Sequence, residues 1–340
     1  MTDPRSGPAL LIGDIGGTNA RFALASPERP AYSEVVKLAC GDFATAIDAI
    51  DHYLAQVGAA RPAGVCLAAA GPIVDGAVRF TNNHWRLGSE DLRAHLGARS
   101  VRLLNDFEAI ALSLPFLGGE DLSDASSDGR HFSTLDPASG FTVAVLGPGT
   151  GLGVAGLLGR DGRLYPVVGE GGHRGFSPES ARQIEVLQVL RERFERVSDE
   201  RLLSGPGLVN IHRALQRLHG SPEEPLSAAD IFGRAEARQD RLAVEAVKLF
   251  FEVLGQVAGD LALELGAEQG VFIAGGIVKR YPELLAASGF RAAFEHKGRH
   301  RSLMERVPAH LITHDDPGLL GAAYGALRDF QEAVSPGRTP

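Results

Sequence analysis

Two segments of the sequence combine glycine with hydroxyl, amide or carboxylate side chains, as phosphate-binding turns do. The first, residues 13–19, reads Gly-Asp-Ile-Gly-Gly-Thr-Asn and lies between two apolar runs, which predicts strand, turn and strand. Glycines let the backbone approach a bulky anion because no Cβ stands in the way, and successive N–H groups can bind the anion. Asp14 would repel a bare phosphate, so the segment indicates a nucleotide that arrives with Mg²⁺. A tight hairpin turn that merely needs glycine is the alternative.

Other phosphate-binding motifs do not fit this sequence. A Walker A loop needs a Gly-Lys pair, which the chain lacks, and a dinucleotide-binding loop needs G-x-G-x-x-G before a helix, whereas a strand is expected here. The second segment, residues 147–151, reads Gly-Pro-Gly-Thr-Gly and again lies between two apolar runs. Two strand–turn–strand patterns in one chain suggest two related halves, each with a phosphate-binding turn.

Asp106 is a candidate for proton transfer, because it directly follows the short apolar run 101–104. The carboxyl ends of strands in an open α/β sheet are where ligands bind. A sugar hydroxyl is a poor nucleophile, and a carboxylate that accepts its proton would accelerate its reaction by roughly 10²–10⁴. The alternative is that Asn105 and Asp106 only cap the helix that follows.

A second group of polar residues lies in the Gly-rich segment 169–173, where two glycines separate Glu170 from His173. A carboxylate can accept hydrogen bonds from two neighbouring sugar hydroxyls, and an imidazole can donate or accept beside it. A solvated surface loop is the alternative. Glu200, after Ser198 and Asp199, by itself indicates only the start of a helix, where acids interact favourably with the helix dipole.

Hydrophobic periodicity predicts the elements that hold these residues. Beyond the two hairpins, strands are expected at 64–70, 78–81, 101–104 and 270–274. Helices are expected at 43–57, 90–96, 107–117, 179–197, 199–218 (interrupted near 204–207), 240–265 and 319–334. The last helix is expected to pack on the N-terminal domain. Residues 118–140 are polar and rich in Gly, Ser and Asp, which predicts a loop that crosses between domains.

The composition is that of a globular protein of two domains, with 340 residues, 44% hydrophobic and 22% charged. The net charge of −8 does not favour nucleic acid or an anionic membrane as partner. The two cysteines, Cys40 and Cys66, form no disulfide or metal pattern, which indicates a reducing compartment. We expect neither a signal peptide nor a membrane span, and hence a cytoplasmic protein.

Seven segments together resemble the bacterial ATP-dependent glucokinases, in the order and spacing of that family. They are residues 13–19, 81–85, 105–107, 149–153, 169–173, 203–208 and 273–277. The resemblance extends from about residue 10 to about residue 330. The first turn alone also occurs in actin-like and chaperone ATPases, but the set is specific. A related branch of repressors and sugar kinases carries a Cys-rich zinc motif that is missing here, so no structural zinc is expected.

The resemblance implies an α/β fold with two domains, of the actin-like or hexokinase-like (ribonuclease H-like) type, and a cleft between them. We expect a small domain of residues 1–117 plus 316–340 and a large domain of residues 118–315. The implied reaction transfers the γ-phosphoryl group of ATP, with Mg²⁺, to the 6-hydroxyl of D-glucose, the first step of glycolysis. A homodimer is implied as well.

The resemblance also assigns roles to individual residues. Asp106 is expected to be the catalytic base, and Asp14 to hold Mg²⁺ through water. The expected glucose ligands are Asn105, Asp106, Glu170, His173 and Glu200. The expected nucleotide-binding residues are Gly13, Asp14, Ile15, Gly16, Gly17, Thr18, Asn19, Gly149, Thr150, Gly151, Gly275 and Gly276. A non-catalytic sugar sensor would tend to lose Asp14 or Asp106, and a simple ATPase would lack the segment with Glu170 and His173.

Overall fold

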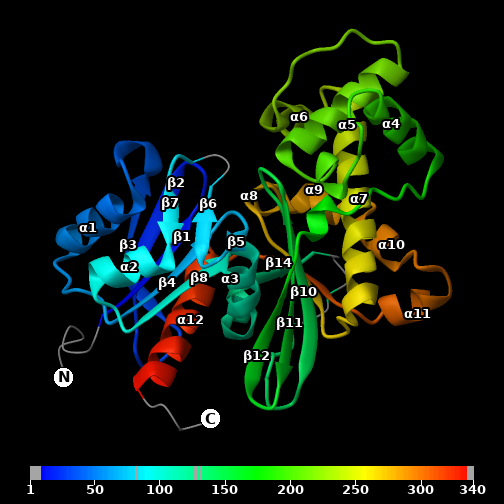
Figure 1. Ribbon diagram of the computed structural model, residues 1–340. Coiled ribbons are helices and arrows are strands. Elements are labelled where there is room, and N and C mark those ends of the chain that lie inside the picture. Colours follow the sequence, from blue (N-terminus) through cyan, green and yellow to red (C-terminus); the bar gives the residue numbers. More distant parts are fainter. Residues whose placement is uncertain (1–8, 81–82, 126–128, 130–131, 335–340) are drawn as a thin grey trace. The chain divides into compact units, whose positions relative to one another are not determined.

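The structure is a computed structural model that describes residues 9–80, 83–125, 129 and 132–334 (Figure 1). The chain divides into two compact units. The first consists of Met1–Leu117, Gly162–Val168 and His314–Pro340, and the second of Gly118–Asp161 and Gly169–Thr313. Among the helices of the described ranges, none is both long and apolar enough to span a membrane.

The first unit is built on a five-stranded sheet of order β3-β2-β1-β4-β8, with a small sheet of order β5-β6-β7. The strands are β1 (Leu10–Ile15), β2 (Asn19–Ala25), β3 (Tyr32–Ala39), β4 (Gly64–Ala69), β5 (Ile73–Val74), β6 (Ala77–Arg79), β7 (Arg86–Gly88) and β8 (Ser100–Asn105). The helices are α1 (Ala46–Val57), α2 (Ser89–Leu96), α3 (Asp106–Ser113) and α12 (Pro317–Val334), with 3-10 turns at Cys40–Asp42 and Leu114–Phe116.

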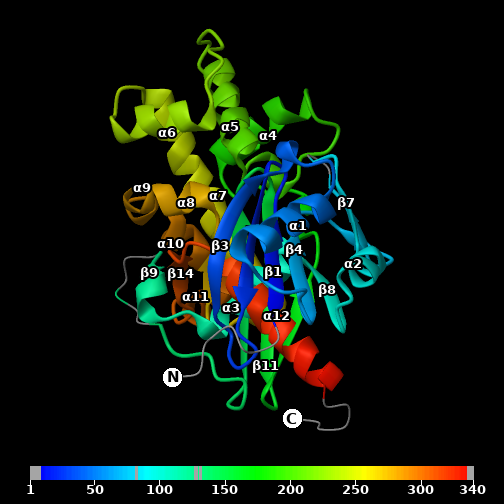
Figure 2. The ribbon, with the colours of Figure 1, turned by 90° about the vertical axis from the view of Figure 1, so that its left-hand side faces the viewer.

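Alternate residues of β1 and its neighbours face opposite sides of this sheet, as strand geometry requires. Leu11 and Phe22 belong to a core that includes Ile50 of α1. On the other side α12 contacts β1, β4, β8 and α3, as the red helix in Figures 1 and 2 illustrates. The expectation that the closing helix packs on the N-terminal part of the chain is confirmed.

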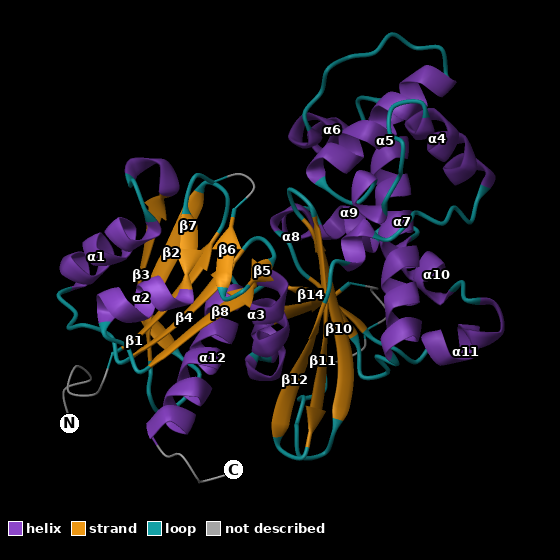
Figure 3. Ribbon diagram, in the orientation of Figure 1, coloured by secondary structure: helices purple, strands orange, loops and turns teal. Residues whose placement is uncertain are grey.

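The second unit is organised around a sheet of order β12-β11-β10-β13-β14-β9, whose edge strand β12 is counted with the first unit, and the long helix α7 contacts β10 of this sheet (Figure 3). The strands are β9 (Leu122–Asp124), β10 (Phe141–Pro148), β11 (Leu152–Arg160), β12 (Arg163–Val168), β13 (Val271–Ile273) and β14 (Ala309–Ile312). The helices are α4 (Ala181–Arg191), α5 (Gly205–Leu218), α6 (Ala228–Glu236), α7 (Arg241–Leu265), α8 (Gly276–Arg280), α9 (Pro282–Ala286), α10 (Phe290–Glu295) and α11 (Arg301–Met304). Further 3-10 turns lie at Gly119–Asp121, Gly171–His173, Asp199–Arg201 and Gly298–His300.

The two sheets share one strand order. In β3-β2-β1-β4-β8 and in β12-β11-β10-β13-β14, an antiparallel hairpin is followed by parallel strands. The second sheet adds β9, which pairs antiparallel with β14. This repeated order confirms the inference of two related halves.

Several expected boundaries were wrong for local reasons. The first helix begins at Ala46 and not at residue 43, because the Thr45 side chain accepts the Asp48 N–H and caps it. The α-helix after Asp106 ends at Ser113, because Pro115 cannot continue it. Residues 118–140 are not all loop, since β9 lies among them. The helix expected to reach residue 197 ends at Arg191.

Candidate active site

In the first unit, the Gly-rich turn and the Asn105–Asp106 pair lie at the same edge of the sheet. The register of β1, β4 and β8, which run parallel, aligns Ile15 with Ala69 and Ala69 with Asn105. The turn after β1 therefore lies two strands, or about 10 Å, from the start of α3. This edge is the carboxyl end of the parallel strands, where α/β sheets bind ligands.

Contacts of the backbone fix the shape of the first turn. Gly16 N–H donates to the Asn19 carbonyl at 2.9 Å, and the Thr18 carbonyl accepts from Cys40 N–H at 2.9 Å. The Gly16 carbonyl accepts from the Asn83 amide at 3.3 Å. The Asn19 amide donates to the Thr18 hydroxyl at 2.9 Å, so these two side chains are joined at the end of the hairpin.

The first-turn residues serve different purposes. A Cβ on Gly13 would lie 2.9 Å from side-chain atoms of both Leu67 and Phe22, so packing of the core requires glycine there. Ile15 is fully buried and belongs to the same core. A Cβ on Gly16 would meet nothing closer than the Asn19 carbonyl at 3.5 Å. The fold does not require glycine at position 16, and a ligand that approaches the backbone would explain it.

Asp14 lies directly opposite Arg21 in the hairpin, with 3.9 Å between its carboxylate and the guanidinium. Arg21 also forms an ion pair with Asp316 at 3.1 Å, just before α12. Burial raises the pKa of Asp14 above its usual range; Arg21 counteracts this and Asp316 adds to it. A Cβ on Gly318 would lie 3.5 Å from the Asp14 carboxyl group, so the first turn of α12 also packs against it. The sequence motifs did not point to Arg21. The register of the β1–β2 hairpin would have placed it opposite Asp14.

The donor set around Asp14 fits Mg²⁺ bound mainly by phosphates and water. Within residues 9–80, 83–125, 129 and 132–334, no three His, Cys, Asp or Glu side chains form a metal-binding group. Mg²⁺ usually keeps several waters and takes only one or two protein carboxylates beside substrate phosphates. The Asp14 side chain is 30% exposed, so one such carboxylate is accessible from solvent.

Asn105 caps α3, as the alternative interpretation of this pair proposed. Its side-chain oxygen accepts the N–H groups of Phe107 at 2.9 Å and Glu108 at 3.3 Å. Asp106 is half-buried in the first helical turn, and its Oδ1 accepts from Phe107 N–H at 2.9 Å. A Cβ on Gly321 of α12 would overlap the Ala109 carbonyl, so α12 lies directly on α3 and fixes its position.

In the second unit, the N-terminus of α5 lies against the second Gly-rich turn. Gly149 N–H donates to the Gly151 carbonyl at 2.7 Å, and the Gly149 carbonyl accepts from Gly205 N–H at 2.9 Å. Ser204 caps the helix by accepting from Gly207 N–H at 3.0 Å. A helix N-terminus favours anions through its dipole and its unpaired N–H groups. We had assigned no role to this segment, although Ser followed by Gly-Pro signals such a helix start.

Gly275 and Gly276 lie beside the same Gly-rich turn of the second unit. Gly275 has φ +102°, and a Cβ on it would lie 2.5 Å from the Pro148 carbonyl, so the backbone itself requires glycine. A Cβ on Gly276, at the start of α8, would meet nothing within 4 Å. A Cβ on Gly205 would lie 3.9 Å from the Ile277 side chain. The second turn, the start of α5 and the start of α8 therefore converge.

The candidate sugar-binding residues of this unit gather around the start of β11. Glu170 and His173 are exposed, and His173 N–H donates to the Glu170 carbonyl at 3.0 Å. Gly172, between them, lies so close to the Leu152 carbonyl that a Cβ would overlap it. Leu152 N–H donates to Glu200 Oε2 at 2.9 Å. The loop of Glu170 and His173, Glu200 and the turn with Thr150 are thus brought together, while Asp106 and the first turn belong to the other unit.

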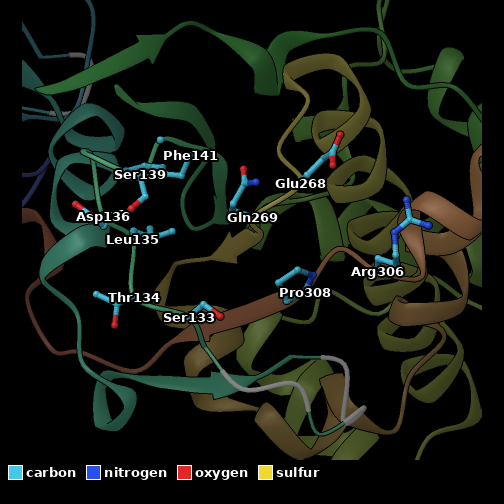
Figure 4. Close-up of a pocket in the computed structure, with 11 residues that line it drawn as sticks. Ser133, Thr134, Leu135, Asp136, Ser139, Phe141, Glu268, Gln269, Arg306 and Pro308 are labelled. Atoms are coloured by element: carbon cyan, nitrogen blue, oxygen red, sulfur yellow. Dashed lines mark hydrogen bonds between the residues drawn. The ribbon is translucent and has the colours of Figure 1, made fainter. Parts of the chain in front are cut away.

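A different cavity of the second unit, of about 390 Å³, lies at the opposite ends of the strands (Figure 4). Phe141 begins β10, Gln269 precedes β13 and Pro308 precedes β14, so the cavity is at the amino ends of these strands. Figure 4 shows Asp136, Ser139, Glu268 and Arg306 around it. It contains none of the residues predicted to bind sugar or nucleotide.

Comparison with known proteins agrees with this arrangement. The family model described as glucokinase matches residues 11–329. The chain is 44% identical over 327 residues to a glucokinase of Caulobacter sp. (strain K31), covering 96% of this chain and 97% of that protein. It superposes with TM-score 0.85 and 31% identity on the crystal structure of a glucokinase from an Antarctic psychrotroph, over 95% of this chain and 100% of that one. A glucokinase of Balamuthia mandrillaris, solved in complex with glucose, gives TM-score 0.74 and 26% identity, over 94% and 93%.

The repeated sheets and the likeness to these structures define an α/β protein of the actin-like class of sugar kinases, which confirms the expected fold class. Within that class, the chain belongs to the glucokinase family. The expectation of a kinase enzyme is confirmed at the level of this family.

Proposed function

We propose that the protein transfers the γ-phosphoryl group of ATP to the 6-hydroxyl of D-glucose, with Asp106 as general base. The products are glucose 6-phosphate and ADP. The observation that carries the proposal is the shared edge of β1, β4 and β8, which puts Asp106 and the Asp14 turn two strands apart. A phosphate held at the turn and a hydroxyl held at Asp106 would therefore be neighbours.

In the proposed step, the Asp106 carboxylate accepts the proton of the sugar hydroxyl. The hydroxyl oxygen forms a bond to the γ-phosphorus, and the bond from that phosphorus to the β,γ-bridging oxygen breaks, leaving ADP. Asn105 holds the start of α3 by capping it, and the Phe107 N–H orients the Asp106 carboxylate. Such catalysis depends mainly on position and on charge stabilisation.

Nucleotide and metal binding would use the open glycines. Gly16, Gly149 and Gly276 leave space beside the backbone, and the start of α5 adds a favourable dipole. Bound Mg²⁺ would offset the phosphate charge, with Asp14 holding it through water. Glu170, His173 and Glu200 would bind the sugar hydroxyls, as in the resemblance described above.

The test is an assay of ADP release with ATP, Mg²⁺ and a panel of hexoses, with a control lacking sugar. We expect ADP only when glucose is present. ADP release that is equal without sugar would favour a simple ATPase. Glucose binding without ADP release would favour a sugar sensor.

The base is tested by Asp106→Asn. We expect kcat to fall by about 10²–10⁴ while glucose affinity stays within about tenfold, because the base acts mainly in the transition state. The matched control is Asp91→Asn, since Asp91 is also an aspartate in the first turn of a helix, α2, of the same unit. Equal losses of binding and turnover would contradict the base role.

We also infer a cytoplasmic homodimer with domains of residues 1–117 plus 316–340 and 118–315; the compact units differ from these domains in that residues 162–168 and 314–315 belong to the first unit. Buried, unpaired Cys40 and Cys66 are consistent with a reducing compartment. Sedimentation equilibrium would measure the oligomeric state, and limited proteolysis would locate the boundaries.

A further inference from the structure

The two segments that carry the candidate sugar-binding residues of the second unit are paired with each other through the backbone. Phe176 N–H donates to the Val197 carbonyl at 3.1 Å, and Asp199 N–H donates to the Arg174 carbonyl at 2.9 Å. Gly175 and Ser198 form the bridge between them. Arg174 follows His173 directly and Asp199 precedes Glu200, so this short ladder connects the backbones of both sugar-binding residues.

Side chains at the same two positions form an ion pair. Arg174 Nε lies 3.1 Å from Asp199 Oδ2. Asp199 is only 2% exposed, whereas the Arg174 side chain is 32% exposed. A buried carboxylate needs a charge partner, because desolvation disfavours its ionised form. Among the described residues, Arg174 is the cation that forms an ion pair with Asp199.

The other carboxylates that pair with Arg174 belong to the helix α7. Its guanidinium also contacts Glu264 and, at 3.9 Å, Asp260, both on α7. Asp260 in turn pairs with Lys297 at 2.8 Å. Arg174 therefore connects the ladder to the long helix, and its Nε is the part directed to Asp199.

We propose that the Arg174–Asp199 ion pair is a positioning device for glucose: it holds the relative positions of His173 and Glu200. This rests on the proposed function, in which both residues bind the sugar. Neither Arg174 nor Asp199 is proposed to touch glucose. The ion pair adds side-chain rigidity to the ladder, so that the loop after β12 and the segment before α5 present their ligands at a fixed separation. Fixed separation lowers the entropy lost when a multidentate ligand binds.

The test is Asp199→Asn, which keeps the shape of the side chain and removes its charge. We expect the KM for glucose to rise by about 10- to 100-fold, because small misplacements of binding groups carry costs of this order. The KM for ATP and kcat should stay within about threefold, since the Gly149 turn has its own contacts. Arg174→Lys keeps the positive charge without the Nε geometry, and we expect it to recover part of the glucose affinity lost in Arg174→Gln.

Glu264→Gln is the matched control, because it removes a different carboxylate from the same guanidinium. We expect its KM for glucose to remain within about twofold, as for an exposed ion pair of little energetic consequence. A glucose KM raised equally by Glu264→Gln and Asp199→Asn would overturn the proposal. So would losses in glucose KM, ATP KM and kcat that all follow a lowered melting temperature.

Measurements on the wild-type protein distinguish a failure of this proposal from a failure of the proposed function. Calorimetric titration with glucose alone measures binding without catalysis. If the wild type binds glucose but releases no ADP, the kinase proposal fails and the effect of Asp199→Asn on glucose Kd still decides the positioning proposal. If the wild type is active and Asp199→Asn leaves glucose KM and Kd unchanged, only the positioning proposal fails. If the wild type neither binds nor phosphorylates glucose, both fail.

Discussion

The β1–β2 and β10–β11 hairpins occupy equivalent places in two sheets of the same strand order, yet their turns are built differently. The first turn has a carboxylate, Asp14, paired with Arg21 across the hairpin. The second has no acid of its own, but the Glu200 side chain accepts the Leu152 N–H beside Gly151. A helix begins beside each turn: α5 at Gly149, and α12 at Asp14.

The difference suggests how one repeated topology serves two tasks. The carboxylate of the first turn, Asp14, faces a cation, Arg21, and is itself part of the hairpin, so this turn is suited to the metal-bearing end of a nucleotide. The carboxylate beside the second turn, Glu200, accepts the Leu152 N–H, and the start of α5 at Gly149 offers a helix dipole that favours an anion. The second turn thus lies beside Glu200, one of the residues that we propose for the sugar.

The strongest test of this comparison is Asp14→Asn in the first turn. Loss of the carboxylate should raise the Mg²⁺ concentration for half-maximal activity by about 10- to 100-fold, the range for residues that support a bound metal. Isothermal titration of Mg²⁺ and nucleotide, together with rates over a range of Mg²⁺ concentrations, measures this. Asp161→Asn is the control, since Asp161 lies in an exposed turn with φ +53°, which asparagine tolerates. An unchanged Mg²⁺ requirement in Asp14→Asn would remove the distinction between the turns.

A smaller effect is expected from glycine replacements in the second turn. A Cβ on Gly149 would meet nothing within 4 Å, so Gly149→Ala should fold normally and raise the KM for ATP by about tenfold, equivalent to about 1.4 kcal/mol. A Cβ on Gly151 would lie 2.5 Å from Glu200 Oε2, so Gly151→Ala should instead lose about 1–3 kcal/mol of stability and weaken glucose binding. Thermal unfolding and substrate KM values distinguish the two. Identical behaviour of both variants would show that open space beside the backbone does not mark ligand contact.

The last prediction concerns stability and not activity, and the acid paired with arginine in the second unit, Asp199. Burial raises the pKa of Asp199 to about 6, against the lowering effect of Arg174, whereas an unfolded aspartate has a pKa of about 3.9. The folded state then binds the proton more tightly than the unfolded state. The free energy of unfolding of the wild type, relative to Asp199→Asn, should therefore fall as pH rises from about 4 to about 6 and then level off, by at most about 3 kcal/mol.

Denaturant unfolding of both proteins at several pH values measures this difference. A difference that rises with pH over the same interval would mean that the ion pair, and not burial, dominates the pKa of Asp199.

Local sequence determined the parts of this protein that depend on near neighbours. Both hairpins, the strand that ends at Asn105 and the closing helix were predictable, because apolar alternation and Gly-rich turns are short-range signals. The cap formed by Asn105 was likewise anticipated. Six strands were not predicted. β5, β7, β9 and β14 have only two to four residues, too few to show a period, and β3 and β12 are largely exposed, so their patterns are weak.

Tertiary structure decided which of the candidate residues are neighbours. The sequence separates Gly149, Gly205 and Gly276 by more than fifty residues at each step, and only the hydrogen bond from Gly205 to Gly149 and the contact of α8 with β10 bring them together. The sequence alone gives no reason to pair Arg174 with Asp199, since their contact depends on a bridge between two irregular segments. The residue types in the motifs defined the family's chemistry, while long-range backbone register defined the geometry in which those residues meet.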